Sequence, residues 1–190
     1  MEKKELYLGG GCFWGMEELF RKENGVIDTD SGYCGGKNQN PTYQNHEGHA
    51  ETLKIVYDPS KTDFKHILDF FFRIHNPTTL NQQGKDMGTS YRSVIFFQNE
   101  EEKKIGEEMI HIVDASGVWK KKIVTSIEPF ESFWLGEEEH QDYLQKYPEG
   151  YTCHTVKFDS FLKHSHHNSE LQVRVHPIFP QDPVTEVVDF

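Results

Sequence analysis

The chain has little of what membrane, extracellular and nucleic-acid-binding proteins need. It has three cysteines in 190 residues, an odd number at wide spacing, which does not fit the disulfide framework of a small secreted domain. No apolar run is long enough to cross a bilayer, and the N-terminus lacks the apolar core of a signal peptide. We therefore expect a cytoplasmic, reducing location and no membrane partner.

Basic residues are also scarce. Lysine and arginine number 20 against 31 aspartates and glutamates, so the formal charge is −11. That balance argues against the basic surface that binds nucleic acid, and we expect no such partner. Without repeats or low-complexity tracts, the length fits one domain. We expect this domain to cover residues 1–159, with an extension of unassigned role at 160–190, and the protein to be a monomer.

The hydrophobic periodicity predicts an α+β fold. Strands, helices and turn signals follow one another in the order β-α-β-β-α-β, which matches the ferredoxin-like two-layer sandwich, with a mixed sheet and long functional loops. A loop at 76–90 is long enough to be functional. The expected strands are 6–8, 26–33, 49–57, 92–98 and 122–127, and the expected helices are 12–22, 63–75, 100–114 and 137–146.

A glycine-rich segment, Gly9–Gly15, is the strongest chemical signal in the chain. It joins a predicted strand to a predicted helix and places Cys12 in the first turn of that helix. Unpaired N–H groups and the positive end of the helix dipole favour the reactive thiolate there. A buried cysteine that only packs is the alternative, but such a residue does not need three glycines before it. Trp14 points away from the apolar stripe and is free to line a site.

Several polar residues are candidates to act with Cys12. Glu51 shares a strand face with apolar residues; if buried, its carboxyl would have a raised pKa and could donate a proton. The alternative is an exposed carboxylate near a strand end. For the others the alternatives are ordinary turn or packing roles. These others are Tyr43 in a loop, Asp86 and Tyr91 in or just after the long loop, and Tyr143 in the last predicted helix.

A second cysteine could resolve an oxidised Cys12. Cys153 lies in a turn-rich, flexible segment, as suits a mobile resolving thiol, and Cys34 is the competing partner. The histidines, including a cluster at His164, His166 and His167, lack a familiar zinc spacing, so we expect no metal site. The glycine segment also lacks the Lys-Ser/Thr ending of a phosphate loop.

Motifs spread over residues 4 to about 158 resemble the peptide methionine sulfoxide reductases of the A type. Together, and in this order, they are highly specific. They are Gly10-Gly11-Cys12-Phe13-Trp14-Gly15, Gly32-Tyr33-Cys34-Gly35-Gly36, Asn40-Pro41-Thr42-Tyr43, Gly48-His49-Ala50-Glu51, Val56-Tyr57-Asp58-Pro59, His75-Asn76-Pro77-Thr78, the stretch from Asn81 to Ser93, and His140-Gln141-Asp142-Tyr143-Leu144.

The resemblance implies a peptide-methionine (S)-S-oxide reductase that acts on methionine-S-sulfoxide, free or in oxidised proteins. Cys12 would attack the sulfoxide sulfur and become a sulfenic acid. The remaining roles are implied as follows: Phe13 and Trp14 form the methyl pocket, protonated Glu51 supplies a proton to the oxygen, Tyr43 and Tyr91 donate hydroxyl hydrogen bonds to it, Asp86 supports the site, and Tyr143 borders it.

The family also implies how the enzyme is regenerated. Cys153 matches the position of the resolving cysteine, which forms a disulfide that thioredoxin reduces. No cysteine follows Cys153, so we expect a cycle of two cysteines. No bound cofactor is implied; thioredoxin or another dithiol acts as the reductant.

Two rival functions remain open from the residues. Cys12 with His49 or His75 could form a cysteine hydrolase or acyltransferase, which would give a stable thioester and need no reductant. A redox-sensing or metal-binding module could instead use the cysteines and the histidine tail, without turnover of a sulfoxide.

Overall fold

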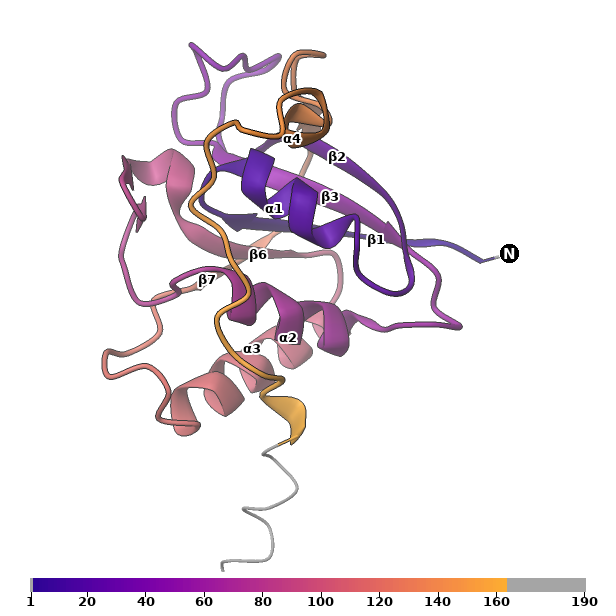
Figure 1. Ribbon diagram of the computed structural model, residues 1–190, viewed down its shortest axis with the longest axis vertical. Coiled ribbons are helices and arrows are strands. Elements are labelled where there is room, and N and C mark those ends of the chain that lie inside the picture. Colours follow the sequence, from indigo (N-terminus) through magenta and orange to yellow (C-terminus); the bar gives the residue numbers. More distant parts are fainter. Residues whose placement is uncertain (1, 164–190) are drawn as a thin grey trace, which may run out of the picture.

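The computed structural model describes residues 2–163 (Figure 1). Its main elements, in chain order, are β1 (Lys4–Gly10), α1 (Phe13–Phe20), β2 (Val26–Cys34), β3 (Ala50–Tyr57), α2 (Phe64–Ile74), β6 (Ser93–Phe97), α3 (Glu100–Ala115), β7 (Ser126–Pro129), β8 (Phe133–Leu135) and α4 (Tyr143–Lys146). The short strands β4 (Gln82–Gln83) and β5 (Asp86–Met87) and the 3₁₀ turn η1 (Thr89–Tyr91) lie between α2 and β6.

A six-stranded mixed sheet organises the molecule. Its strand order is β7-β6-β1-β3-β2-β8, and all neighbours are antiparallel except β6 and β7. The predicted β-α-β-β-α-β order is present as β1, α1, β2, β3, α2 and β6. The α+β class is therefore confirmed; β7 and β8 extend the sheet at its two edges.

Three predictions of local structure were wrong in detail. The strand expected at 122–127 is shifted: β7 begins at Ser126, because Ile123 turns into the core and the N–H of Val124 bonds to the Pro77 carbonyl. The helix expected at 137–146 is reduced to α4, since Asp142 adopts a left-handed conformation that a helix cannot continue through. The loop expected at 76–90 contains the β4–β5 hairpin and part of η1.

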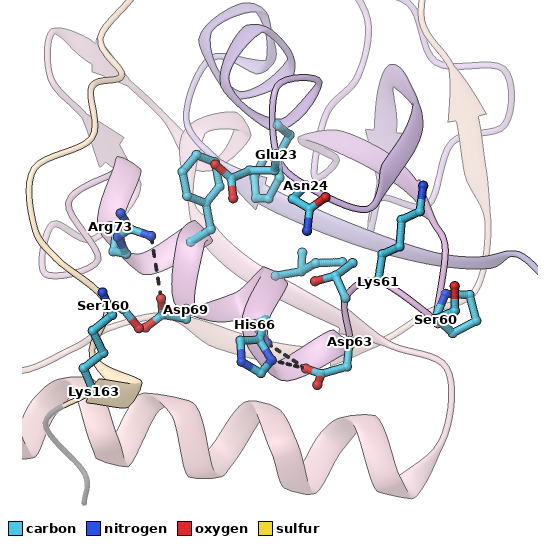
Figure 2. Close-up of a pocket in the computed structure, with 15 residues that line it drawn as sticks. Glu23, Asn24, Ser60, Lys61, Asp63, His66, Asp69, Arg73, Ser160 and Lys163 are labelled. Carbon is cyan, nitrogen blue, oxygen red and sulfur yellow. Dashed lines mark hydrogen bonds and ion pairs between the residues drawn. The ribbon is translucent and has the colours of Figure 1, made fainter.

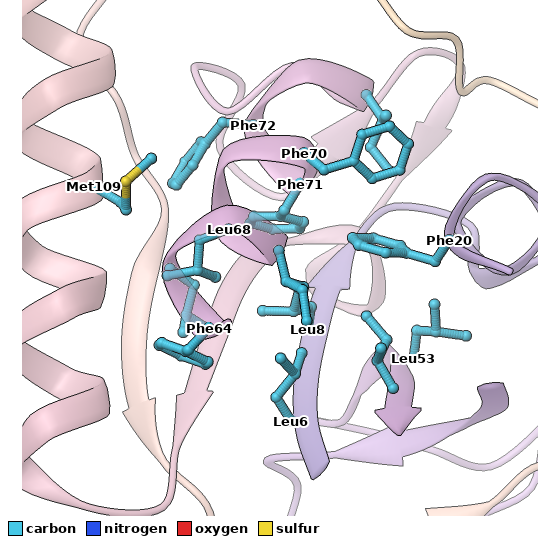
Figure 3. Packing of buried hydrophobic residues seen from close by; sticks show 14 of the residues in the cluster. Leu6, Leu8, Phe20, Leu53, Phe64, Leu68, Phe70, Phe71, Phe72 and Met109 are labelled. Atoms are coloured by element: carbon cyan, nitrogen blue, oxygen red, sulfur yellow. The ribbon is translucent and has the colours of Figure 1, made fainter. Parts of the chain in front are cut away.

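The main core lies between the sheet and the helices. Alternate residues of β1 and β3 point to this face, and they meet apolar side chains from all three long helices (Figure 3). The members labelled in the figure are Leu6, Leu8, Phe20, Leu53, Phe64, Leu68, Phe70, Phe71, Phe72 and Met109. The opposite face of the sheet has a smaller cluster of Tyr7, Cys34, Ala50, Val94 and Phe96.

The segment after α4 runs back across the helical face, past α1 and α2 (Figure 1). The N–H of Lys157 bonds to the Arg73 carbonyl, and the N–H of Phe161 bonds to the buried Asp69 carboxylate at 2.7 Å. Phe161 itself lies in the main core. This path carries residues 152–154 across the start of α1. The expected boundary at residue 159 stays a prediction, and most of the expected extension lies outside the described residues.

Candidate functional site

Cys12 lies at the junction of β1 and α1, where the sequence places the glycine turn. Cys12 is the N-cap residue of α1, because the helix begins one residue later than predicted. Only 6% of Cys12 is exposed. Gly11 has a φ of 101°, and a Cβ there would collide with the side chain of Gln83. A glycine is therefore needed to turn the chain from the strand into the helix.

Glu51 lies on the helical face of β3, directly beside Cys12 in space. It pairs with Tyr33 of β2 across the ladder, and one of its carboxylate oxygens accepts the backbone N–H of Phe13 at 3.1 Å. Only 1% of Glu51 is exposed, so the alternative of a surface carboxylate was wrong. Burial raises the pKa of Glu51 to about 8, against the opposing effect of the Phe13 N–H. Glu51 is therefore mostly protonated at neutral pH.

The thiol of Cys12 is held in its neutral form. Burial, and then the nearby Glu51, raise the pKa of Cys12 above its usual range; the Trp14 backbone N–H opposes this only in part. The expectation that the helix N-terminus alone would favour a thiolate was wrong, since desolvation outweighs the dipole here. The site thus holds a neutral thiol next to a neutral carboxylic acid.

An aromatic wall lies beside the sulfur. The ring of Trp14 stacks on Tyr143 with a centroid distance of 3.8 Å. Its indole N–H donates to Nδ1 of His140 at 3.2 Å, and His140 also contacts Phe13, at 5.4 Å between centroids. The predicted residues Phe13, Trp14 and Tyr143 are therefore brought together. His140, which holds the wall in place, was not singled out, although it lies in one of the quoted motifs.

Two tyrosines also reach the site, and the ring of Tyr43 lies 4.6 Å from that of His140. The hydroxyls of Tyr43 and Tyr91 are hydrogen-bonded to each other, and burial, followed by the nearby Glu51, raises the pKa of both. Glu137 fixes the Tyr43 loop, because its carboxylate accepts both the Tyr43 backbone N–H and the buried Tyr33 hydroxyl, each at 2.7 Å. No pattern in the sequence links Glu137 to residues about a hundred positions earlier, so it was missed.

Cys153 reaches the site from the C-terminal segment. Its sulfur accepts the backbone N–H of Cys12 and interacts with the side chains of Asp86 and Tyr151. The Tyr151 hydroxyl donates to Asp86 at 3.0 Å. Asp86, predicted as a supporting residue, therefore lies against the second cysteine rather than at the aromatic wall.

Cys34 lies on the other side of the sheet. It pairs with Ala50, whereas its neighbour Tyr33 pairs with Glu51. Successive residues of a strand point to opposite faces, so Cys34 packs in the small cluster away from Cys12. Burial raises the pKa of Cys34 to about 12. The thickness of the sheet separates this thiol from the site.

The histidines of the hydrolase alternative are bonded elsewhere. His49 bonds through Nε2 to the Asn38 carbonyl, and His75 bonds to the Phe71 carbonyl and the Ser93 hydroxyl. Within residues 2–163 neither histidine has a hydrogen bond to Cys12, and no group of three or more His, Cys, Asp or Glu residues is placed to hold a metal ion. The cluster at His164, His166 and His167 lies outside the described residues.

A separate hollow of about 550 Å³ lies between the end of α1 and the start of α2 (Figure 2). Its lining carries charges of both signs, with Asp63 bonded to His66 at 2.8 Å and Asp69 lying 3.8 Å from Arg73. None of the predicted catalytic residues lines it. No helix in the described part of the chain has the length and apolar character to cross a membrane.

The match to known proteins extends over most of the chain. The family model described as "Peptide methionine sulfoxide reductase" matches residues 4–171. The peptide methionine sulfoxide reductase MsrA of Mycolicibacterium gilvum is 57% identical over 153 residues, covering 80% of this chain and 90% of that protein. The corresponding protein of Nocardia farcinica is 54% identical over 158 residues, covering 83% and 93%.

Solved structures agree with this match. Reduced Mxr1 from Saccharomyces cerevisiae has a TM-score of 0.77 at 35% identity, covering 83% of this chain and 93% of that one. Methionine sulfoxide reductase A of Corynebacterium diphtheriae has a TM-score of 0.70 at 34% identity, covering 79% and 77%. With its thiol, buried carboxyl and aromatic wall at one site, the chain belongs to the A-type peptide methionine sulfoxide reductases.

Proposed function

We propose that the enzyme reduces the S epimer of methionine sulfoxide, free or in proteins, with Cys12 as nucleophile and Glu51 as proton donor. One observation carries the proposal: a buried carboxyl with a pKa near 8 is bonded to the N–H of Phe13, the residue next to Cys12. A sulfoxide sulfur is a poor electrophile unless its oxygen is protonated or strongly hydrogen-bonded. A neutral acid beside a thiol meets that need.

The proton movements follow from the two neutral groups. Glu51 protonates the sulfoxide oxygen as the Cys12 sulfur attacks, and the thiol proton replaces the one that Glu51 gave up. The sulfoxide sulfur gains two electrons and leaves as a thioether, while the Cys12 sulfur loses two and becomes a sulfenic acid. Tyr43 and Tyr91 turn their paired hydroxyls toward the oxygen and hold it in place.

The aromatic wall supports the choice of substrate and of epimer. Phe13 and Trp14 offer an apolar surface for the methyl group, and Tyr143 borders it. With the oxygen fixed by Glu51 and the tyrosines, only one arrangement of the three groups on sulfur places the methyl group at this wall. That restriction accounts for a single sulfoxide epimer per enzyme.

We propose that Cys153 resolves the sulfenic acid. Its thiol attacks Cys12, a disulfide forms, and the sulfenic oxygen leaves as water. Asp86 supports the site by holding Cys153 and Tyr151 together. The contact of Cys153 with the Cys12 N–H favours this partner over Cys34, which lies across the sheet. Two-electron reduction by thioredoxin or another dithiol then restores both thiols; a solved structure has Mxr1 of yeast in complex with Trx2.

Thiol counting by mass spectrometry tests this cycle. Mixing the reduced enzyme with methionine-S-sulfoxide, without reductant, should give one methionine per enzyme and a Cys12–Cys153 disulfide. The Cys34→Ser variant is the matched control and should behave as the wild type. A Cys12–Cys34 link would overturn the assignment of Cys153, and absence of methionine would overturn the function.

We also propose that β1, α1, β2, β3, α2 and β6 form a ferredoxin-like unit, which the order β6-β1-β3-β2 and its antiparallel neighbours support. A monomeric cytoplasmic enzyme without a bound cofactor remains our expectation. Size-exclusion chromatography with light scattering tests the monomer, and the visible absorption spectrum of the purified protein tests for a coloured cofactor.

A further inference from the structure

A buried histidine lies next to the resolving cysteine. His154 is only 3% exposed, and its Nδ1 lies 3.5 Å from the Cys153 sulfur. Its other ring nitrogen, Nε2, lies 2.8 Å from the Gly10 carbonyl oxygen, in the glycine turn just before Cys12. The imidazole therefore bridges the two segments that carry the two cysteines.

The contact with Gly10 sets the tautomer of the ring. A carbonyl oxygen can only accept, so Nε2 must carry the proton and donate it. Burial lowers the pKa of His154 to about 4, so the ring is neutral at pH 7. Nδ1 then has a free lone pair, and the Cys153 thiol is the polar side-chain group within bonding distance of it among the described residues.

We propose that His154 is the base of the resolving step: its Nδ1 takes the proton of the Cys153 thiol as that sulfur attacks the Cys12 sulfenic acid. This inference rests on the proposed role of Cys153. The need for a base is clear, because burial and the charge of Asp86 raise the pKa of Cys153 to about 11. At neutral pH few such thiols would be ionised without help.

The step balances without a further reactant. The Cys153 S–H bond breaks and its proton passes to Nδ1. The S–S bond forms as the S–O bond of the sulfenic acid breaks, and the leaving hydroxide becomes water by taking the proton that the imidazolium gives up. An imidazolium with a depressed pKa releases this proton readily. Net, one thiol and one sulfenic acid give one disulfide and one water.

The Asp86 carboxylate is a second possible acceptor for the proton of this thiol. Its carboxylate already accepts the Tyr151 hydroxyl, and it is partly open to solvent. A negative charge beside the thiol also disfavours the thiolate that must form. His154, neutral and free of that repulsion, is the better placed base, whereas Asp86 orients the segment.

The test separates the two chemical steps in a single turnover. His154→Gln keeps an N–H at the Nε2 position to donate to Gly10 but removes the basic Nδ1. With methionine-S-sulfoxide and no reductant, methionine formation should stay within about threefold of the wild type, while disulfide formation should slow roughly 10²-fold. The sulfenic acid should then accumulate and be trapped by dimedone on Cys12.

The pH profile distinguishes a base from a packing residue. In the wild type, disulfide formation should depend little on pH between 6 and 8, since the base is neutral throughout. In His154→Gln the rate should rise toward tenfold per pH unit, because it then follows the thiolate fraction of Cys153. The other groups facing this sulfur are Asp86, Tyr151, Lys157 and Cys12; Asp86→Asn, which retains His154, should keep the flat profile.

Each outcome is informative. Unchanged disulfide formation in His154→Gln, or a profile as flat as that of the wild type, would overturn the role of His154. Equal slowing of methionine and disulfide formation would show a structural effect and would overturn it too. A wild-type disulfide that does not involve Cys153 would instead contradict the proposed function, and this outcome is visible without any His154 variant.

Discussion

At the scale of single residues, burial sets the protonation states of Cys12 and Glu51. Cys12 and Glu51 are each held in the neutral form, since burial raises the pKa of both and no lysine, arginine or histidine among residues 2–163 offsets their desolvation. In the proposed mechanism, the acid form of Glu51 is the one that protonates the sulfoxide oxygen. Removing the carboxyl of Glu51 should change both the rate of methionine formation and the free energy of unfolding.

Glu51→Gln should slow methionine formation roughly 10²-fold or more, as loss of a general acid does. It should also stabilise the fold above neutral pH. The raised pKa means that stability from Glu51 is present below pH 4.5 and is lost as the pH rises through about 8. We expect urea denaturation to show similar stability at pH 5, and a variant more stable than the wild type by about 2 kcal/mol or more at pH 9.

An unchanged single-turnover rate in Glu51→Gln would remove the proton-donor role. A wild type more stable than the variant at pH 9 would contradict the burial argument, since an ionised carboxylate would then be well accommodated.

At the scale of elements, the helix α1 is packed on both sides of its first turn. Glu51 of β3 bonds to the Phe13 N–H, and on the outer side Gly15 lies against Thr152 and His154. Glu17 is also buried, and it accepts the Asp142 N–H at 2.9 Å. This bond joins α1 to the start of α4, which begins at Tyr143. The start of α1 is therefore where the strand, the aromatic wall and the C-terminal segment meet.

Gly15→Ala should act on the resolving step. A Cβ at this position would overlap the Thr152 hydroxyl and His154 Nδ1, so the segment carrying Cys153 must move away. A displacement of about 1 Å can cost roughly 10²-fold in rate, and we expect quenched-flow measurements to show a loss of that order in disulfide formation. The loss in methionine formation should be smaller.

Gly106→Ala on α3 is the matched control, because its Cβ would meet Ile127 at 3.3 Å and Ile95 at 3.7 Å and not the segment that carries Cys153. It should change neither step. A Gly15→Ala enzyme that resolves as fast as the wild type would show that this close contact does not position Cys153.

The elements also show what could be predicted from sequence. β1, β2, β3, α2 and α3 were predicted to within a few residues, because their apolar periodicity is set by one core face. β8 was not predicted, and the helix expected at 137–146 was too long, because residues 130–147 are held by long-range bonds such as Gln141 to Ser31. Cys12 and Glu51 could be predicted as site residues because they lie in sequence motifs. The contacts of Glu137, His140 and His154 could not, because they join chain segments that only the fold brings together.

At the scale of the whole molecule, buried titratable groups set how stability responds to pH. Burial raises the pKa of Glu17 to about 7 and of Glu51 to about 8, and lowers that of His75 to about 3 and of His154 to about 4. The carboxyls lose their contribution to stability as the pH rises from 4.5 through 7–8. The histidines lose theirs as the pH falls below 6.5.

A plateau of stability should result. Between pH 4.5 and 6.5 the unfolded chain holds protons on the two histidines and the folded chain on the two carboxyls, so the effects cancel. Below this range stability should fall, and above it stability should fall until about pH 8. Calorimetric Tm values from pH 3.5 to 9 would measure the curve, and Glu17→Gln combined with Glu51→Gln should flatten its alkaline side. A sharp single maximum would contradict this balance.

The position of Cys34 across the sheet limits which disulfides the oxidised enzyme can form. A third thiol within reach would let the oxidised protein exchange disulfides and settle into a species that a reductant does not recognise. Because the sheet separates Cys34 from the site, we expect every turnover to pass through the Cys12–Cys153 pair and to give a single oxidised species. The sheet that supports the site thus also keeps Cys34 apart from Cys12 and Cys153. We expect Cys34 to stay a free thiol throughout the cycle, so that the loss of the other two thiols can be counted against it.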